Sequence, residues 1–191
     1  MKYTKKLVAL HKGLSLIESA MVLALAATVT AGVMFYYQSA SDSNKTQSAI
    51  SEVMSATSAI NGLYIGQSSY ENLNVNVLKN SSAIPDNYKK NNKIMNPFGG
   101  DLNVFSAPAN NSGYGYRLKL TQLPKSACIS LATLNLGTSA AGYGVNTDAL
   151  NNSGATGSSS GHSKKEAISP SEAADWCSDN TSANSVTYFM K

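Results

Sequence analysis

Histidine, cysteine and charge are all scarce in this sequence. Its 191 residues include two histidines, two cysteines and 14 % charged side chains, with a formal net charge of +4. His11 lies near the N-terminus and His162 lies in a low-complexity stretch, so the chain offers no ordered Ser–His–Asp set and no zinc cluster. We therefore expect no enzymatic activity, no cofactor and no metal site.

The positive charge is concentrated at the N-terminus. Without residues 1–13, the basic residues fall from 15 to 11, which equals the 11 acidic residues. The four basic residues that this removes are Lys2, Lys5, Lys6 and Lys12. Nucleic-acid binding requires a basic face, so we expect no nucleic-acid partner. At roughly 100–200 residues per domain, the length fits one domain with an additional element.

Two short motifs match catalytic or phosphate-binding patterns only formally. Gly157–Gly161 fits G-x-S-x-G, but no strand precedes it and no apolar helix follows it, as a nucleophile elbow requires. The glycines of Gly113–Tyr116 and Gly142–Gly144 form runs that are too short for a phosphate loop. We interpret all three as chance matches.

A long apolar segment follows the basic N-terminus. Leu14–Tyr37 is 24 residues long and contains one charged side chain, Glu18. As a helix it would measure about 36 Å, enough to cross a hydrocarbon core of about 30 Å. A cleavable secretory signal has a shorter apolar core of roughly 7–15 residues. The preceding lysines predict a cytoplasmic N-terminus and export of the remainder.

Glu18 is unusual because a carboxylate inside a membrane helix is costly and normally has a partner. One interpretation is an ordinary signal anchor in which Glu18 reaches water at the membrane interface. The other is a specific role for the carboxylate, and the residues around Glu18 favour it.

Residues 13–18, Gly-Leu-Ser-Leu-Ile-Glu, resemble the processing site of type IV prepilins. The resemblance implies that a prepilin peptidase cuts between Gly13 and Leu14 and methylates the new N-terminus at Leu14. It also makes Glu18 the characteristic fifth residue of the mature chain. Leucine at position 14 indicates the type IVb branch, although leaders there are often longer than 13 residues. Segments such as SAINGLYIGQ, NPFGG and VTYFMK extend the resemblance over nearly the whole chain, most weakly over residues 145–168.

The resemblance implies an α+β fold, in which a long N-terminal helix packs on an antiparallel sheet with a disulfide-delimited C-terminal region. It divides the chain into a leader (1–13), a transmembrane or filament-core segment (14–37) and a globular head (38–191). The implied function is that of a structural subunit that polymerises into a surface pilus for adhesion and bacterial aggregation. The implied partners are other copies of the chain, the peptidase, inner-membrane assembly machinery, and host or bacterial cell surfaces. The subunit would wait in the inner membrane and end in an extracellular filament.

Physical chemistry gives Glu18 a role within this interpretation. Cleavage would create an amine at Leu14 that is largely positive at neutral pH. In an apolar filament core, that amine and the Glu18 carboxylate of a neighbouring copy would neutralise each other. We therefore expect Glu18 to act in assembly.

Helical periodicity continues beyond the apolar segment and predicts one helix from Leu14 to Ile65. Gly32 and Gly62 are candidate bends, and Gly66 is a candidate terminator. Apolar or small residues recur at spacings of three and four along the second half, at Ile50, Val53, Met54, Thr57, Ile60, Leu63 and Tyr64.

The middle of the chain contains many turn signals. Residues 67–113 predict a loop region with at most short regular pieces, and Tyr114–Leu120 alternates as a strand does. Lys125–Leu136 fits either a helix or a strand; we favour a helix that ends at Gly137.

The last part of the chain opens with residues 151–165, which are low in complexity and read as flexible. Ser169-Pro170-Ser171-Glu172 matches a capping box with proline at the first helical position, predicting a helix from Ser169 to about Cys177. Ser185–Met190 predicts a strand that packs on the rest of the domain and lies in the middle of the sheet.

Cys128 and Cys177 both lie in the exported part, where an oxidising compartment favours one disulfide. The two cysteines lack the short spacing and the histidine partners that a metal site or a redox pair requires. Trp176, beside Cys177, is expected to pack in the core rather than to form a ligand platform. The resemblance further implies that residues 128–177 carry most of the exposed surface.

Two other functions remain open at this point. A pseudopilin or minor pilin of a secretion machine would share the fold and the processing. A membrane-anchored ectodomain that binds a ligand without polymerising would share only the anchor.

Overall fold

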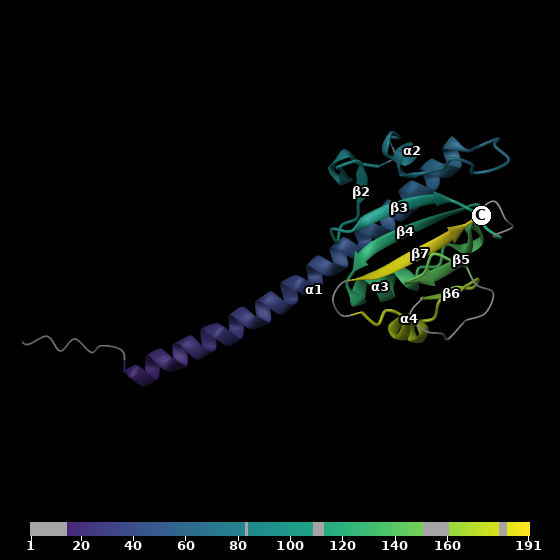
Figure 1. Cartoon of the computed structure of the whole chain (residues 1–191). Helices are drawn as coiled ribbons and strands as arrows, with labels where there is room; N and C mark the ends of the chain where they lie inside the picture. The colour runs from purple at the N-terminus through teal and green to yellow at the C-terminus, as the bar shows by residue number, and fades with distance from the viewer. Residues whose placement is uncertain (1–14, 83, 109–112, 151–160, 180–182) are drawn as a thin grey trace, which may run out of the picture. The chain divides into compact units, whose positions relative to one another are not determined.

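The computed structural model describes residues 15–82, 84–108, 113–150, 161–179 and 183–191 (Figure 1). The chain divides by its internal contacts into two compact units, Met1–Ser41 and Asp42–Lys191. Gly13 and Leu14 lie outside the described residues, so the predicted processing site stays a prediction.

The first helix, α1, runs from Leu16 to Leu63 and includes Gly32 and Gly62. It agrees closely with the predicted range. Gly66 lies just beyond it with a φ of +82°, in the left-handed region that favours glycine, as expected for the residue that ends a helix. In the second unit, one stripe of α1 is buried, formed by Ala49, Glu52, Val53, Ala56 and Ile60.

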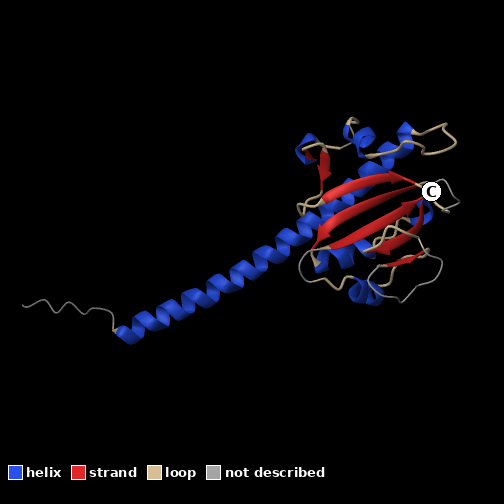
Figure 2. Cartoon of the chain, viewed as in Figure 1, coloured by secondary structure: helices blue, strands red, loops and turns tan. Residues whose placement is uncertain are grey.

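The strands of the described residues, red in Figure 2, form one seven-stranded antiparallel sheet in the order β1-β2-β3-β4-β7-β5-β6. Their bounds are β1 Lys89–Lys90, β2 Lys93–Met95, β3 Asp101–Ser106, β4 Tyr116–Leu123, β5 Ala140–Val145, β6 His162–Lys164 and β7 Asn184–Met190. All seven residues of β7 are buried. The C-terminal strand is thus internal to the sheet, as its apolar sequence predicts.

The described residues of the second unit also form three short helices and two 3₁₀ turns. The helices are α2 Val75–Lys79, α3 Lys125–Ala132 and α4 Pro170–Trp176, and the turns are η1 Asp86–Tyr88 and η2 Gly137–Ser139. Ser169 caps α4 in a full capping box with Glu172, which confirms the sequence motif.

The hydrophobic core lies between one face of the sheet and the helices α1 and α3. Alternate residues of β4, among them Leu118 and Leu120, are fully buried, and burial of such side chains stabilises by roughly 1.5–3 kcal/mol each. The hydroxyl of Tyr188 in β7 donates a 2.7 Å hydrogen bond to the carbonyl oxygen of Leu131 in α3. The Tyr116 hydroxyl in β4 meets the side-chain oxygen of Asn61 in α1 at 3.5 Å.

The opposite face of the sheet is covered by the loop that follows β5. Thr187 of β7 donates a 2.7 Å hydrogen bond from its hydroxyl to the carbonyl oxygen of Thr147. Leu150 packs on Gly142, where a Cβ atom would lie 2.4 Å from the Leu150 side chain. Glycine in β5 therefore permits the close approach of this loop.

Several sequence predictions need correction. The region 67–113 contains a six-residue strand, β3, that the flanking turn signals obscured. Helix α3 ends at Ala132, not at Gly137, whose φ of +63° serves the η2 turn instead. Residues 162–164, expected to be flexible, pair with β5 as strand β6. Residues 151–160 of the same stretch lie outside the described residues.

Candidate functional site

The first part of α1 presents an apolar surface to its surroundings. Every described large hydrophobic side chain from Leu16 to Tyr37 is more than half exposed, with Leu16 at 90 % and Tyr36 at 79 %. The helix is long and apolar enough to cross a membrane, and none of its most apolar window is buried. So large a continuous apolar surface requires lipid or other protein as its surroundings.

Glu18 forms a capping box at the start of this helix. The backbone N–H of Ser15 donates to Oε2 of Glu18 at 2.8 Å, and the backbone N–H of Glu18 donates to Oγ of Ser15 at 3.2 Å. The box satisfies two otherwise unpaired N–H groups and places negative charge at the helix N-terminus. This contact was not among the sequence predictions, although Ser-x-x-Glu before an apolar run is its known signature.

The disulfide Cys128–Cys177 joins α3 to the C-terminal end of α4. Its Cα atoms are 5.9 Å apart and both cysteines are fully buried. Next to it, the half-buried Trp176 packs against the core and stacks on His162, with ring centroids 5.0 Å apart. The predicted packing role of Trp176 is confirmed.

An ion pair connects β6 to α4 beside the disulfide. Lys164 Nζ lies 2.9 Å from Oε2 of Glu172. The Ser169 backbone N–H, then Lys164 and the Ser169 hydroxyl, lower the pKa of Glu172 from 4.5 to about 2. The carboxylate therefore stabilises the fold above pH 4.5, and this contribution is lost as the pH falls toward 2.

Comparisons with known proteins bear on this arrangement of apolar helix, sheet and disulfide. A sequence model of the bundlin family matches residues 38–191. The chain belongs to the bundlin family.

Two curated relatives are 69 % identical to this bundlin-family chain over 185 residues, which cover 95 % of the chain and 95 % of each relative. Both are described as the major structural subunit of the bundle-forming pilus, from Escherichia coli O111:H- and from Escherichia coli O127:H6 (strain E2348/69 / EPEC).

Two solved structures share the fold of the chain. A type IVb pilin from Salmonella typhi has a TM-score of 0.52 and 17 % identity, covering 73 % of this chain and 97 % of its own. A type IV pilin from Vibrio cholerae El Tor biotype has a TM-score of 0.52 and 17 % identity, covering 78 % and 99 %. At this identity the likeness establishes the type IV pilin fold, as predicted.

Glu52 is a second acidic residue on α1 that sequence analysis passed over. It lies on the buried stripe, it is 5 % exposed, and neither carboxylate oxygen has a hydrogen-bond partner among the described residues. Burial raises the pKa of Glu52 from 4.5 to about 8. Its spacing from Ala49 and Ala56 on the helix was the signal that could have found it.

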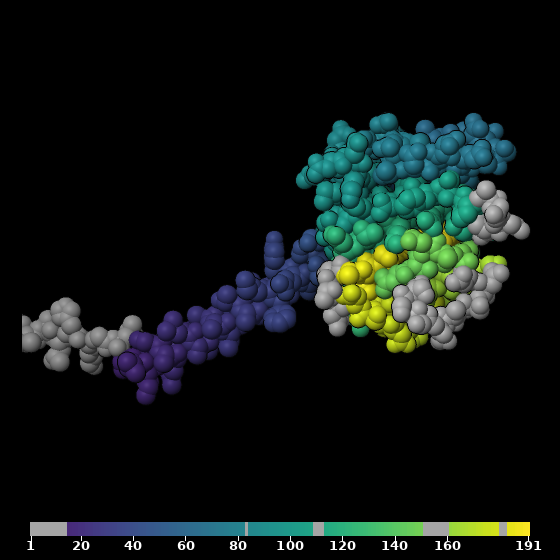
Figure 3. Space-filling model, viewed as in Figure 1, coloured from purple at the N-terminus to yellow at the C-terminus, as the bar shows by residue number. Residues whose placement is uncertain are grey.

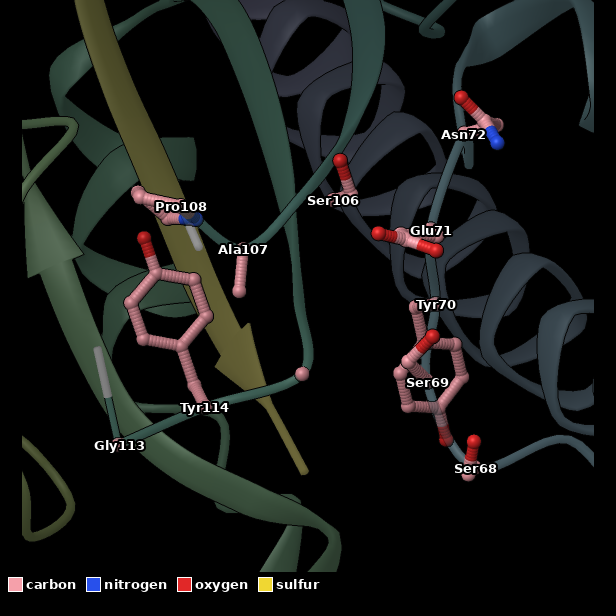
Figure 4. A pocket seen from close by; sticks show the side chains of 11 residues that line it. Ser68, Ser69, Tyr70, Glu71, Asn72, Ser106, Ala107, Pro108, Gly113 and Tyr114 are labelled. Carbon is pink, nitrogen blue, oxygen red and sulfur yellow. The ribbon is translucent and has the colours of Figure 1, made fainter. Parts of the chain in front are cut away.

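A cavity of about 770 Å³ lies beside the end of β3. Figure 4 shows Ser68–Asn72 along one side and Pro108, Gly113 and Tyr114 along the other. The ionisable side chains among its lining residues are Glu71, Tyr70 and Tyr114. No group of three metal-ligating side chains occurs in the part of the chain that the structure describes.

Proposed function

We propose that this chain is the major structural subunit of a bundle-forming, type IVb pilus. The observation that carries the proposal is the 69 % identity to two such subunits over 95 % of both chains. The chain would polymerise through its N-terminal helix and end in an extracellular filament for adhesion and bacterial aggregation. The exposed apolar surface of α1 supports this, since lipid can cover it before assembly and other copies can cover it afterwards.

Maturation would begin with a prepilin peptidase. In this proposal residues 1–13 are a leader, the peptidase cuts between Gly13 and Leu14, and Leu14 becomes an N-methylated terminus. Residues 14–37 then anchor the subunit in the inner membrane, and residues 38–191 form the exported head. The motif at residues 13–18 supports these assignments.

Assembly would exchange lipid contact for contact between helices. Lipid and leucine are equally apolar, so close packing and small residues contribute most of the attraction; this segment supplies Ala24, Ala26, Ala27, Ala31 and Gly32. Glu18 would neutralise the Leu14 amine of a neighbouring copy. The capping contact to Ser15 uses Oε2, which leaves Oε1 for the amine.

The remaining partners follow from the same proposal. Inner-membrane assembly machinery would drive polymerisation, and host or bacterial surfaces would meet the finished filament. Residues 128–177 would carry most of the exposed filament surface. The exposure of Lys165, Glu166 and Asp175 in that region supports this.

The test begins with the intact mass of the chain expressed with and without prepilin peptidase. Loss of residues 1–13 and gain of one methyl group only with the peptidase would support the maturation steps. Filaments containing this chain as the abundant component of sheared surface material would support a major subunit. A minor component would indicate a pseudopilin or minor pilin, and an uncut chain would indicate an anchored ectodomain.

The role of Glu18 is tested separately with Glu18→Ala and Glu71→Ala, two removals of an exposed carboxylate. We expect Glu18→Ala to give processed and folded chain that does not enter filaments, and Glu71→Ala to assemble. Normal filaments from Glu18→Ala would refute the assembly role and leave the family intact.

A further inference from the structure

The two edges of the sheet carry opposite charge. At the β1–β2 edge, residues 75–100 contain four lysines and one aspartate. At the β6–α4 edge, residues 161–179 contain two lysines and four acidic residues. The basic edge is Lys79, Lys89, Lys90 and Lys93 with Asp86; the acidic edge is Glu166, Glu172, Asp175 and Asp179 with Lys164 and Lys165.

These two edges lie at opposite ends of the second unit. Figure 1 places α2 and β2 at one end of the sheet and β6 and α4 at the other. The space-filling view shows both regions at the molecular surface (Figure 3). Between the edges, Lys119 of β4 pairs with Asp148 at 3.1 Å on the outer face of the sheet.

The basic edge contains an unfavourable contact that points to an outside partner. Lys90 and Lys93 lie directly opposite each other across β1 and β2, and like charges in such a pair are destabilising. Lys93 is compensated by Asp101, with Nζ 2.7 Å from Oδ2. Lys90 is exposed, and no ion pair joins it to another described residue.

The acidic edge offers matching groups. Glu166 and Asp175 are exposed, and neither forms an ion pair with another described residue. Glu172, by contrast, is held by Lys164. The edge strands contain two and three residues, too short to extend the sheet into a partner, so a contact here is made by side chains.

We propose that copies of this chain associate edge to edge, with Lys90 and its neighbouring lysines facing Glu166 and Asp175 of the next copy. The two surfaces differ, so the contact is heterologous, and it extends into a fibre when the rotation between successive copies does not close into a ring. This inference rests on the proposed function only in placing the contact within or between filaments. Its strength should fall with salt, because exposed charges are screened over about 8 Å at physiological ionic strength and about 3 Å at 1 M.

The first test is carbodiimide cross-linking of full-length chain, in filaments and separately in detergent-solubilised membranes. The reagent joins an ammonium and a carboxylate in contact by an amide bond and itself takes up the water. Mixing ¹⁴N and ¹⁵N chains identifies links between copies. We expect mixed-isotope peptides joining Lys90 or Lys93 to Glu166 or Asp175, decreasing at least fivefold in 1 M NaCl. Links between copies that never join these edges would overturn the proposal.

The second test is charge reversal. Lys90→Glu and Asp175→Lys should each reduce these cross-links and the yield of filaments or bundles at least fivefold. The double variant should restore at least half of the wild-type yield, because it exchanges the signs across the contact. Lys125→Glu, the same change at another exposed position, serves as the control and should assemble normally.

Single reversals that behave like the control, or a double variant no better than the weaker single, would overturn the proposal. Circular dichroism establishes that each variant is folded, and Glu166→Lys replaces Asp175→Lys if the latter is not. Absence of filaments from the wild-type chain counts against the proposed function instead, because cross-linking in membranes tests the edge contact independently.

Discussion

Glu52 allows a direct test of how the sheet and α1 pack. Its carboxyl group is buried on the stripe that faces the core, and it has no hydrogen-bond partner among the described residues. Burial disfavours the charged form, so the folded chain holds the carboxyl protonated up to a pKa of about 8. In the unfolded chain it ionises near its ordinary value of 4.5.

The sign of the resulting pH dependence follows from proton binding. Between pH 4.5 and about 8, the folded chain binds one proton at Glu52 that the unfolded chain does not. The free energy of unfolding should therefore fall by about 1.4 kcal/mol for each pH unit of increase in that window. Below pH 4.5 both states are protonated, and the contribution of Glu52 becomes constant.

Replacing Glu52 with Gln removes the titration and keeps the size and polarity of the side chain. Urea unfolding of the full chain in detergent, followed by Trp176 fluorescence from pH 5 to pH 8, gives the free energy for wild type and variant. We expect the free energy of unfolding of the variant, relative to that of wild type, to rise by about 4 kcal/mol from pH 5 to pH 8. The control Glu71→Gln, at an exposed position, should show no comparable trend.

A difference between Glu52→Gln and wild type that stays constant across this range would refute the reasoning. It would mean that water or a partner reaches the carboxylate in the folded chain. Glu52→Leu provides a further check, since it removes the unpartnered polar group. It should be more stable than wild type at pH 8 by a few kcal/mol.

Three further outcomes are expected in the same unfolding assay. Replacing Cys128 and Cys177 together with serine should cost about 4 kcal/mol, the loop-closure value for a sequence separation of 49 residues; a loss below about 1 kcal/mol would show that packing alone holds the region. Ser169→Ala should cost about 1 kcal/mol by removing the α4 cap, and no loss would contradict that role. Tyr188→Phe should cost about 1 kcal/mol, because the Leu131 carbonyl oxygen loses the Tyr188 hydroxyl as a donor but keeps the backbone N–H of Leu134. A cost above about 3 kcal/mol would indicate a repacked core.

Local sequence determined the elements whose signals are carried by neighbouring residues. Helical periodicity located α1, and Gly66 indicated its end to within three residues. The box Ser169–Glu172 located α4, and the apolar ending located β7. Two cysteines in an exported chain were sufficient to predict the disulfide. In each case the sequence signal lies within a few residues or in the composition, although β7 and the disulfide are stabilised by partners distant in sequence.

The candidate site was partly readable for the same reason. Glu18 was conspicuous because it is the one charge in a 24-residue apolar run. Its hydrogen bonds with Ser15 are also local, and the capping motif could have predicted them. The motif at residues 13–18 supplied the family resemblance, and the match over residues 38–191 confirms the family.

Other features required the tertiary structure, because their stabilisation comes from residues distant in sequence. Strand β5 contains Gly142 and Gly144, which have weak strand preference, and it is defined by pairing with β7 and β6 and by the loop packed on it. Glu52 became recognisable as a buried acid only when the sheet covered its stripe. The opposite charges of residues 75–100 and 161–179 became two edges only through the strand order, which places β1 and β6 at the ends of one sheet. Periodicity and capping act along the chain, whereas burial and strand order depend on which distant segments meet.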